Sequence, residues 1–279
     1  MNPTAFQTFA SLLRTRSGLV IGPDKTYLLE SRLQPLLRRE GLASLDALAA
    51  RLSAPQAEPL VREIVEAMTT NESFFFRDGK PFAHLKEIVL PRLLAARQPG
   101  VGLRLWSAAA STGQEAYSLA MLFAEAAPLL GGRSVEILGT DIAREPLARA
   151  REGVYTQFEV QRGLPVQMLL KHFSKEGGAW RIAAPIRKMV RFEEGNLLGD
   201  LRSLGRFDVV FLRNVLIYFD APTKSRVLEA VARLLAPDGY LYLGGAETVL
   251  GLCDRFRAAP DGPGAYMLGG GAGETRLCA

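Results

Sequence analysis

Apolar residues recur at helical spacing through the first quarter of the chain, up to about residue 70. They stand three or four positions apart in successive stretches, and no stretch alternates apolar and polar residues as a half-buried strand would. The pattern therefore predicts helices only, with a break at Gly41 and a helix cap at Ser44. The marking positions are Phe6, Phe9 and Leu13; Leu29, Leu33, Leu36 and Leu37; Leu45, Leu48 and Leu52; and Leu60, Val61, Ile64, Val65 and Met68.

The pattern changes at residue 69, where the polar and aromatic segment TTNESFFFRDGKP begins. We place a domain junction there, so that residues 1–70 form an all-α domain and 71–98 form a linker and a leading helix. From Gly100 onward the rhythm becomes strand, loop and helix, which predicts right-handed crossovers and a mostly parallel sheet covered on both faces. The expected strands are 103–109, 135–141, 188–192, 207–212, 240–245 and 265–268.

One stretch breaks this rhythm. Residues 153–187 are longer than an ordinary connection, and their aromatic and β-branched residues favour a small ordered subdomain inserted in the α/β domain of 99–268. The glycine-rich tail, 269–279, is expected to be flexible.

Composition narrows the class of protein. Of the 279 residues, 48% are hydrophobic and 23% are charged, which is typical of a globular chain. The net charge of +5 indicates local basic patches rather than a nucleic-acid-binding surface. Two cysteines and two histidines are too few for a disulfide framework or a Cys/His metal site, so we expect no metal. Because no signal peptide or long apolar run is present, we expect a cytoplasmic protein without membrane insertion.

Candidate chemistry lies where the predicted strands end, because a doubly wound sheet binds its ligand over the carboxyl ends of its strands. The first loop, ASTGQE, is not a G-x-G-x-x-G phosphate cradle, and its Glu115 suits a cationic ligand group such as an amine or a sulfonium. Asp141 follows the second strand and can accept both hydroxyls of a ribose. Asn196-Leu197 and Asn214-Val215 follow the next two and suit a purine. Single residues of this kind are often ordinary turn or cap residues. Together they favour S-adenosylmethionine, a nucleoside that carries an amino acid and no phosphate.

At these residues the chain resembles the chemotaxis receptor glutamate methyltransferases, the CheR-type family. The resemblance runs from about residue 26 to 268 and is carried by TTNESFFFRD, WSAAASTGQEAYS, LGTDI, RFEEGNLL, FDVVFLRNVLIYFD and LLAPDGYLYLGGAET. It implies an α/β fold: a class I (Rossmann-like) methyltransferase domain with a small inserted β-subdomain, preceded by an all-α N-terminal domain. One departure is GGAET at 244–248, which replaces a commoner His-Ser-Glu pattern.

The resemblance also implies roles for individual residues. Linker residues reach over the cofactor, the run 74–76 of three phenylalanines walls the site, and Tyr218 lies near the transferred methyl group. An active-site arginine is implied on the helix before the first strand, where Arg97 fits better than Arg92. The implied cofactor residues are Asn71, Ser73 and Arg77 above, and Glu115, Asp141, Asn196, Leu197, Asn214 and Val215 beneath.

The implied reaction is protein-glutamate O-methylation on the cytoplasmic helices of a chemoreceptor, with a glutamate methyl ester and S-adenosylhomocysteine as products. A glutamate with a pKa near ~4.3 is already ionised at neutral pH, so the transfer needs no general base. Catalysis then depends on an in-line alignment of acceptor oxygen, methyl carbon and sulfur. Tyr218 and Arg97 are expected to position the acceptor without transferring protons.

The partner implied by the resemblance is a methyl-accepting chemotaxis-type receptor, an acidic helical bundle. Residues 14–39 hold six basic and two acidic side chains, a net charge of 6 − 2 = +4. Lys25, Arg32 and Arg39 are seven residues apart and therefore share one side of the second predicted helix, which can steer an acidic helix or can simply be a solvated face. We expect a monomer.

Two other functions stay open on the sequence. The first is methylation of a small molecule or nucleic acid, for which Asn214-Val215-Leu216-Ile217 lacks the prolines of the amino-methyltransferase motif. The second is binding of the cofactor without turnover, by a module that regulates a partner.

Overall fold

The computed structural model describes residues 1–262 and 264–269. The first domain consists of α1 (Pro3–Ser17), α2 (Thr26–Arg39), α3 (Leu45–Arg51) and α4 (Glu58–Met68), with the short 3₁₀ turn η1 (Pro23–Lys25) before α2. Capping fixes the ends of these helices: the Asn2 side chain accepts from the Ala5 N–H at the start of α1, and Gly18 ends α1 in the left-handed conformation. The buried residues of this domain form their own core, which includes Phe9, Leu33 and Ile64.

The second domain is built on a seven-stranded sheet with the order β6-β2-β1-β7-β8-β10-β9. The strands β6, β2, β1, β7 and β8 run parallel to one another, whereas β10 pairs antiparallel with both β8 and β9. The chain order reverses between β1 and β7, which places the switch point of the sheet there. The bounds are β1 (Leu103–Ala108), β2 (Val135–Asp141), β6 (Val190–Glu194), β7 (Phe207–Leu212), β8 (Leu235–Leu243), β9 (Phe256–Ala258) and β10 (Ala265–Leu268).

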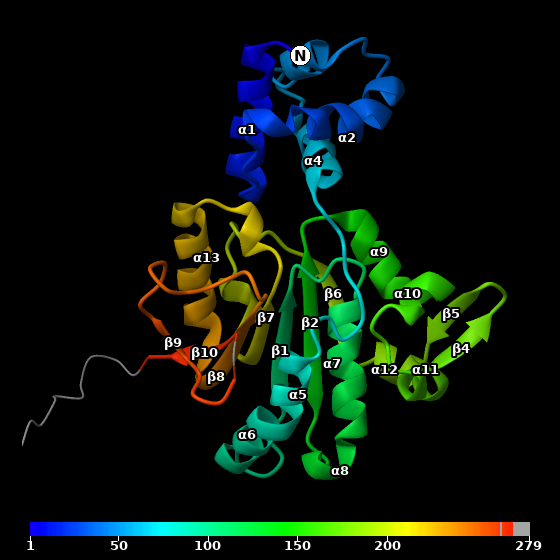
Figure 1. Cartoon of the computed structure of the whole chain (residues 1–279), viewed down its shortest axis with the longest axis vertical. Helices are drawn as coiled ribbons and strands as arrows, with labels where there is room; N and C mark the ends of the chain where they lie inside the picture. Colours follow the sequence, from blue (N-terminus) through cyan, green and yellow to red (C-terminus); the bar gives the residue numbers. More distant parts are fainter. Residues whose placement is uncertain (263, 270–279) are drawn as a thin grey trace, which may run out of the picture.

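Helices cover both faces of this sheet, as Figure 1 shows for α7 on one side and α13 on the other. Alternate residues of β1 point to separate cores: Leu103 and Leu105 pack in the core with α7, and Trp106 and Ala108 pack in the core with α13. The helices are α5 (Lys80–His84), α6 (Leu90–Ala96), α7 (Gln114–Glu125), α8 (Ala127–Leu130), α9 (Arg144–Glu152) and α13 (Ala221–Leu234), with a π turn η2 (Leu85–Val89) and 3₁₀ turns η3 (Arg202–Leu204) and η4 (Leu216–Tyr218).

A small subdomain projects from the sheet after α9 (Figure 1). It has a three-stranded antiparallel sheet of order β3-β5-β4. Phe75 of the linker packs edge-on against Tyr155 and Phe173 of this subdomain, with ring centroids 5.0 Å and 5.6 Å away. Its elements are β3 (Val154–Thr156), α10 (Gln157–Gln161), α11 (Val166–His172), β4 (Phe173–Glu176), β5 (Ala179–Ile182) and α12 (Ala184–Arg187).

The fold class expected from the resemblance is confirmed: an all-α domain precedes a methyltransferase sheet that carries a small antiparallel sheet. The short strand β9 was not predicted, and β8 begins five residues earlier than the expected start at 240. The tail expected to be flexible, 269–279, lies outside the described residues except for Gly269. Within the part of the chain that the structure describes, every helix is too short or too polar to cross a bilayer.

Candidate functional site

A cavity that is open on one side to solvent lies over the carboxyl ends of the parallel strands. Its floor comes from the loops that follow β1, β2, β6 and β7, on both sides of the switch point. Its roof comes from the linker, from Ser17 at the end of α1 and from Leu19 in the segment that follows. Figure 1 shows why: the helical domain stands above this end of the sheet.

All of the cofactor residues expected from the sequence line this one cavity. The residues beneath come from four different strand ends, as the doubly wound topology requires. Tyr218, in the turn η4, lines it too. The cofactor residues are Asn71, Ser73, Arg77, Glu115, Asp141, Asn196, Leu197, Asn214 and Val215.

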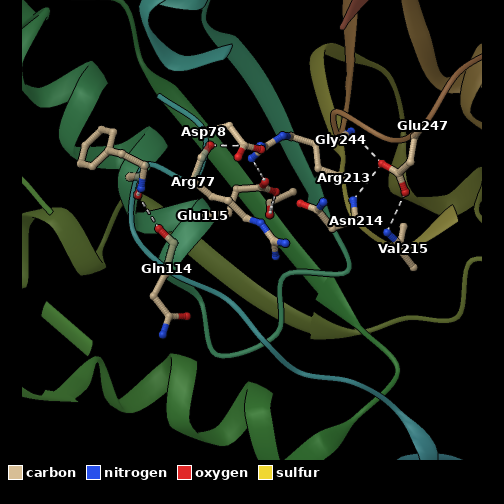
Figure 2. A network of polar contacts seen from close by, with 12 residues as sticks. Arg77, Asp78, Gln114, Glu115, Arg213, Asn214, Val215, Gly244 and Glu247 are labelled. Carbon is tan, nitrogen blue, oxygen red and sulfur yellow. Dashed lines mark hydrogen bonds and ion pairs between the residues drawn. The ribbon is translucent and has the colours of Figure 1, made fainter. Parts of the chain in front are cut away.

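A buried ion network closes the floor of the cavity, and Arg213 is at its centre (Figure 2). The Arg213 side chain is only 1% exposed, and its Nη1 lies 3.0 Å from Glu115 Oε2. Its Nη2 donates to Asp78 Oδ2 at 2.6 Å and to the Arg77 carbonyl at 3.0 Å. Arg213 therefore joins the linker above the cavity to Glu115 of α7 below it.

Glu115 is held in place from two directions. Its Oε1 accepts the Ser107 hydroxyl at 2.8 Å, and its Oε2 faces Arg213. Burial raises the pKa of Glu115 above the usual carboxyl range, and the Arg213 charge and the Ser107 hydrogen bond oppose that rise. The carboxylate lies at the amino end of α7, where the helix dipole also favours a negative charge.

Asp141 shapes the loop after β1 as well as its own strand end. Its Oδ2 accepts from the Ser111 N–H at 2.7 Å and its Oδ1 from the Ala143 N–H at 2.9 Å. The Ser111 hydroxyl in turn donates to the Asn71 carbonyl at 2.8 Å, which ties the linker to the floor. Burial raises the pKa of Asp141, against the effect of these backbone hydrogen bonds.

Several non-glycine residues near the cavity have a positive φ. Every non-glycine residue with positive φ in the described chain belongs to the linker or to a loop after β1 or β7. Such conformations are costly and persist where the surrounding structure enforces them, most often at functional sites. The residues are Phe76, Asp78, Ala109, Ser111 and Asn214.

The two domains meet at the edge of the cavity. Asn196 Nδ2 donates to the Arg16 carbonyl at 2.7 Å, and the Val20 N–H donates to the Tyr218 carbonyl at 3.0 Å. An ion pair between Arg14 and Asp220, 2.7 Å long, lies nearby. Residues expected to contact the cofactor thus also hold the helical domain over the sheet.

The structure does not bring Arg97 to this site. Arg97 follows α6 and precedes β1, so it lies at the opposite edge of the sheet, where it pairs with Asp208 at 2.6 Å and with Asp238. The alternative, Arg92, pairs with Asp261 at that same end. The expectation failed because the residue before a parallel strand lies at its amino end, away from the ligand.

Two other expectations are refined by the packing. Of the three phenylalanines at 74–76, only Phe74 lines the cavity, whereas Phe75 is buried and Phe76 packs edge-on against Phe82.

The basic residues expected on one side of the second helix are not equivalent either. Arg32 donates to the carbonyls of residues 68 and 69 at 2.7 Å and 3.0 Å, and Arg39 pairs with Glu63, while Lys25 is exposed in η1.

Three residues of the site were not anticipated: Arg213, Asp78 and Glu247. A signal for Arg213 exists in the sequence, because it is the one charge at the end of the apolar strand FDVVFL and immediately precedes Asn214. Glu247 accepts backbone N–H groups from Asn214 and Val215 at 2.8 Å and 2.9 Å. No pattern in the sequence indicates that a residue after β8 contacts the loop after β7.

The donor set fits S-adenosylmethionine. Two buried carboxylates, Glu115 and Asp141, offer acceptors for an ammonium group and for ribose hydroxyls. Ala109 and Ser111 are small enough for the backbone to approach a ligand closely.

We expect cofactor affinity to fall as pH decreases, beginning above the ordinary carboxyl range near ~4. Burial raises the pKa of both Glu115 and Asp141, so each is ionised only above that raised value and protonates as pH falls through it. Since the cofactor's ammonium and hydroxyl groups need ionised acceptors, affinity is full above the raised pKa values and is lost below them. Calorimetric titration with S-adenosylhomocysteine between pH 7 and pH 4.5 would measure this. Glu115→Gln should bind more weakly and with a flatter pH dependence; a dependence identical to wild type would contradict the role of Glu115.

Two family models and several known proteins match this chain. Residues 71–262 match the model described as "CheR methyltransferase, SAM binding domain", and residues 4–69 match "CheR methyltransferase, all-alpha domain". The chain is 39% identical over 263 residues to chemotaxis protein methyltransferase Cher2 of Pseudomonas putida, covering 93% of this chain and 95% of that one. It is 41% identical, with the same coverage, to chemotaxis protein methyltransferase 1 of Pseudomonas aeruginosa. A TehB-like SAM-dependent methyltransferase structure from Corynebacterium glutamicum is 19% identical over 55% of this chain and 59% of that one, with a TM-score of 0.32.

Proposed function

Because the chain belongs to the CheR methyltransferase family, we propose that it methylates glutamate side chains on the cytoplasmic helices of a chemoreceptor, using S-adenosylmethionine. It is then a chemotaxis protein methyltransferase of the protein-glutamate O-methyltransferase class. The observation that carries the proposal is the single cavity in which buried carboxylates, strand-end amides and the linker meet.

Each part of the cavity matches a part of the cofactor. Asn196 and Leu197 lie where an adenine would be bound, Asp141 would accept from the ribose, and Glu115 would face the ammonium group. The linker residues Asn71 and Ser73 cover the cavity from above. When bound, S-adenosylmethionine supplies a methyl group on a positively charged sulfur.

The chain's own contribution to the chemistry is alignment. The acceptor carboxylate is ionised at neutral pH and needs no proton removed, so a general base would add nothing. Among the described residues, the cavity lining holds no histidine, and the buried carboxylates Glu115 and Asp141 already accept hydrogen bonds. We assign positioning of the acceptor to Tyr218 and Arg77, which both line the cavity; the Arg77 guanidinium lies 5.1 Å from the Phe74 ring centroid and gives the acceptor an opposite charge.

Tyr218→Phe should lower kcat/KM for receptor roughly 10- to 100-fold, the effect of one hydrogen bond to a charged group. The affinity for S-adenosylhomocysteine should stay within about twofold, and the shape of the pH profile should not change, because Tyr218 transfers no proton. Tyr266→Phe, on strand β10 between β8 and β9, is the matched control and should retain wild-type kinetics. Wild-type kcat and KM in Tyr218→Phe would remove Tyr218 from this role.

The receptor partner is proposed from charge. An acidic helical bundle would be attracted to the basic side of α2, and the attraction would weaken with salt. Of the residues expected there, exposed Lys25 is the best placed for direct contact, whereas Arg32 is committed to the end of α4 and the start of the linker. Lys25→Glu should therefore change the receptor KM without disturbing the cavity. Changes at Arg32 would alter the receptor KM and would also disturb the roof of the cavity.

Incubation with methyl-labelled S-adenosylmethionine and membranes from the source cell tests the function. We expect label on a receptor-sized protein that is released as methanol by mild alkali, because a glutamate methyl ester is base-labile. Mass spectrometry of the receptor should then place each methyl group on a glutamate. Alkali-stable label, or label on nucleic acid or a small molecule, would contradict the proposal.

A further inference from the structure

The carboxylate of Glu247 holds the turn that follows β7. Glu247 lies just beyond β8, in the GGAET segment, yet each of its oxygens accepts hydrogen bonds from backbone N–H groups (Figure 2). Oε2 accepts from Gly244 at 2.7 Å and from Asn214 at 2.8 Å. Oε1 accepts from Val215 at 2.9 Å and from Ile217 at 3.3 Å.

These N–H groups cannot be satisfied by regular secondary structure, because the chain turns sharply after β7. Asn214 has φ 58°, in the left-handed region that non-glycine residues adopt uncommonly and asparagine more readily than most. A carboxylate that accepts several backbone N–H groups at once is a strong and directional constraint. The Glu247 carboxylate therefore substitutes for the missing backbone partners and keeps the turn in its strained form.

The carboxylate itself is closely confined. A Cβ atom on Gly244 would lie 2.7 Å from Glu247 Oε2 and 2.8 Å from Asn214 Nδ2, so there is no room for a larger residue at that position. Glycine at 244 thus allows the two strand ends to approach, and Glu247 joins them.

The residues held in this way belong to the cavity. Asn214 and Val215 line it directly, Tyr218 ends the same turn, and Arg213, the centre of the ion network, immediately precedes it. We propose that Glu247 is a positioning residue, which presets Asn214, Val215 and Tyr218 for the cofactor and the acceptor without touching either. The proposal rests on the use of this cavity for S-adenosylmethionine.

Glu247→Gln tests it, because the amide presents an N–H group where two backbone N–H groups need an acceptor. Asp208→Asn is the matched control: Asp208 also accepts a backbone N–H, that of Arg104 at 2.8 Å, but at the opposite edge of the sheet. Three quantities are measured for both variants: the Kd for S-adenosylhomocysteine, kcat with receptor, and hydrogen exchange of segment 213–218 in the free protein. Thermal unfolding shows how much each variant is destabilised.

We expect Glu247→Gln to raise the Kd at least tenfold, to lower kcat at least tenfold and to speed exchange of 213–218 at least tenfold. Asp208→Asn should lower Tm while it leaves Kd and kcat within twofold. If Glu247→Gln does not fold, Glu247→Asp, which is one methylene shorter, should give the same changes in smaller measure.

The inference would be overturned if the Glu247 variant and Asp208→Asn had the same Kd, the same kcat and the same rate of hydrogen exchange. Failure of the wild-type protein to bind S-adenosylhomocysteine would overturn the proposed function and this inference with it. Wild-type binding combined with an unchanged Kd in the Glu247 variant would overturn the inference alone.

Discussion

Replacement of Arg213 by methionine should abolish most of the cofactor affinity and lower kcat/KM at least hundredfold. Among the described residues, Arg213 is the one cation paired with Glu115, and its loss leaves that buried carboxylate without an ionic partner. Removing one partner of a buried ion pair destabilises a protein by about 3–5 kcal/mol. The same change releases Asp78 and the Arg77 carbonyl, so the linker is no longer fastened to the floor of the cavity.

Arg97→Met is the control for Arg213→Met. Arg97 also makes partly buried ion pairs, with Asp208 and Asp238, but at the other edge of the sheet. The Arg97→Met substitution should lower Tm. It should leave the affinity for S-adenosylhomocysteine and kcat unchanged when both are measured well below Tm. Wild-type cofactor affinity in Arg213→Met would contradict the role given to the network. An equal loss of affinity in Arg97→Met would show that loss of stability alone explains the effect.

Asp141→Asn should weaken cofactor binding roughly 10- to 100-fold. The substitution keeps the shape of the side chain, but its NH₂ group replaces one oxygen that now accepts the Ser111 or the Ala143 N–H. Leaving a buried group unsatisfied costs about 1–3 kcal/mol, and 1.4 kcal/mol corresponds to tenfold in affinity. The proposed acceptor for ribose hydroxyls is weakened at the same time.

Titration calorimetry with S-adenosylhomocysteine measures the effect of Asp141→Asn, with Glu193→Gln as control. Glu193 lies on β6, which pairs with β2, but it faces Arg191 on the surface and does not line the cavity. The affinity of the Glu193→Gln protein for S-adenosylhomocysteine should stay within about twofold of wild type. An Asp141→Asn protein that binds as tightly as wild type would show that Asp141 serves only the loop after β1.

The residues that the sequence could predict are those whose position follows from topology. Strand ends of a parallel sheet meet at one edge, so Glu115, Asp141, Asn196 and Asn214 come together whatever the details of the loops. The helical domain and the sheet could be predicted because apolar residues at helical spacing give way after Gly100 to short apolar runs that alternate with helices. The family motifs placed the linker over the site, which periodicity alone could not do.

The residues that escaped prediction depend on contacts between segments far apart in the chain. Glu247 reaches the loop after β7 because β8 lies beside β7 in the sheet and Gly244 leaves space for the approach. Arg97 was misplaced because it was assigned from the resemblance, whereas topology places a residue just before a parallel strand at the amino end of that strand. Arg32 has the spacing of a surface charge, yet its guanidinium is engaged by the end of α4 and the start of the linker.

A crystal structure of the protein with S-adenosylhomocysteine tests the central claim most directly. We expect the ligand in the cavity between the linker and the strand ends, with its adenine at Asn196 and Leu197, its ribose at Asp141 and its amino group toward Glu115. Ligand density at another place on the protein, or a cavity that stays empty at saturating ligand concentration, would contradict it.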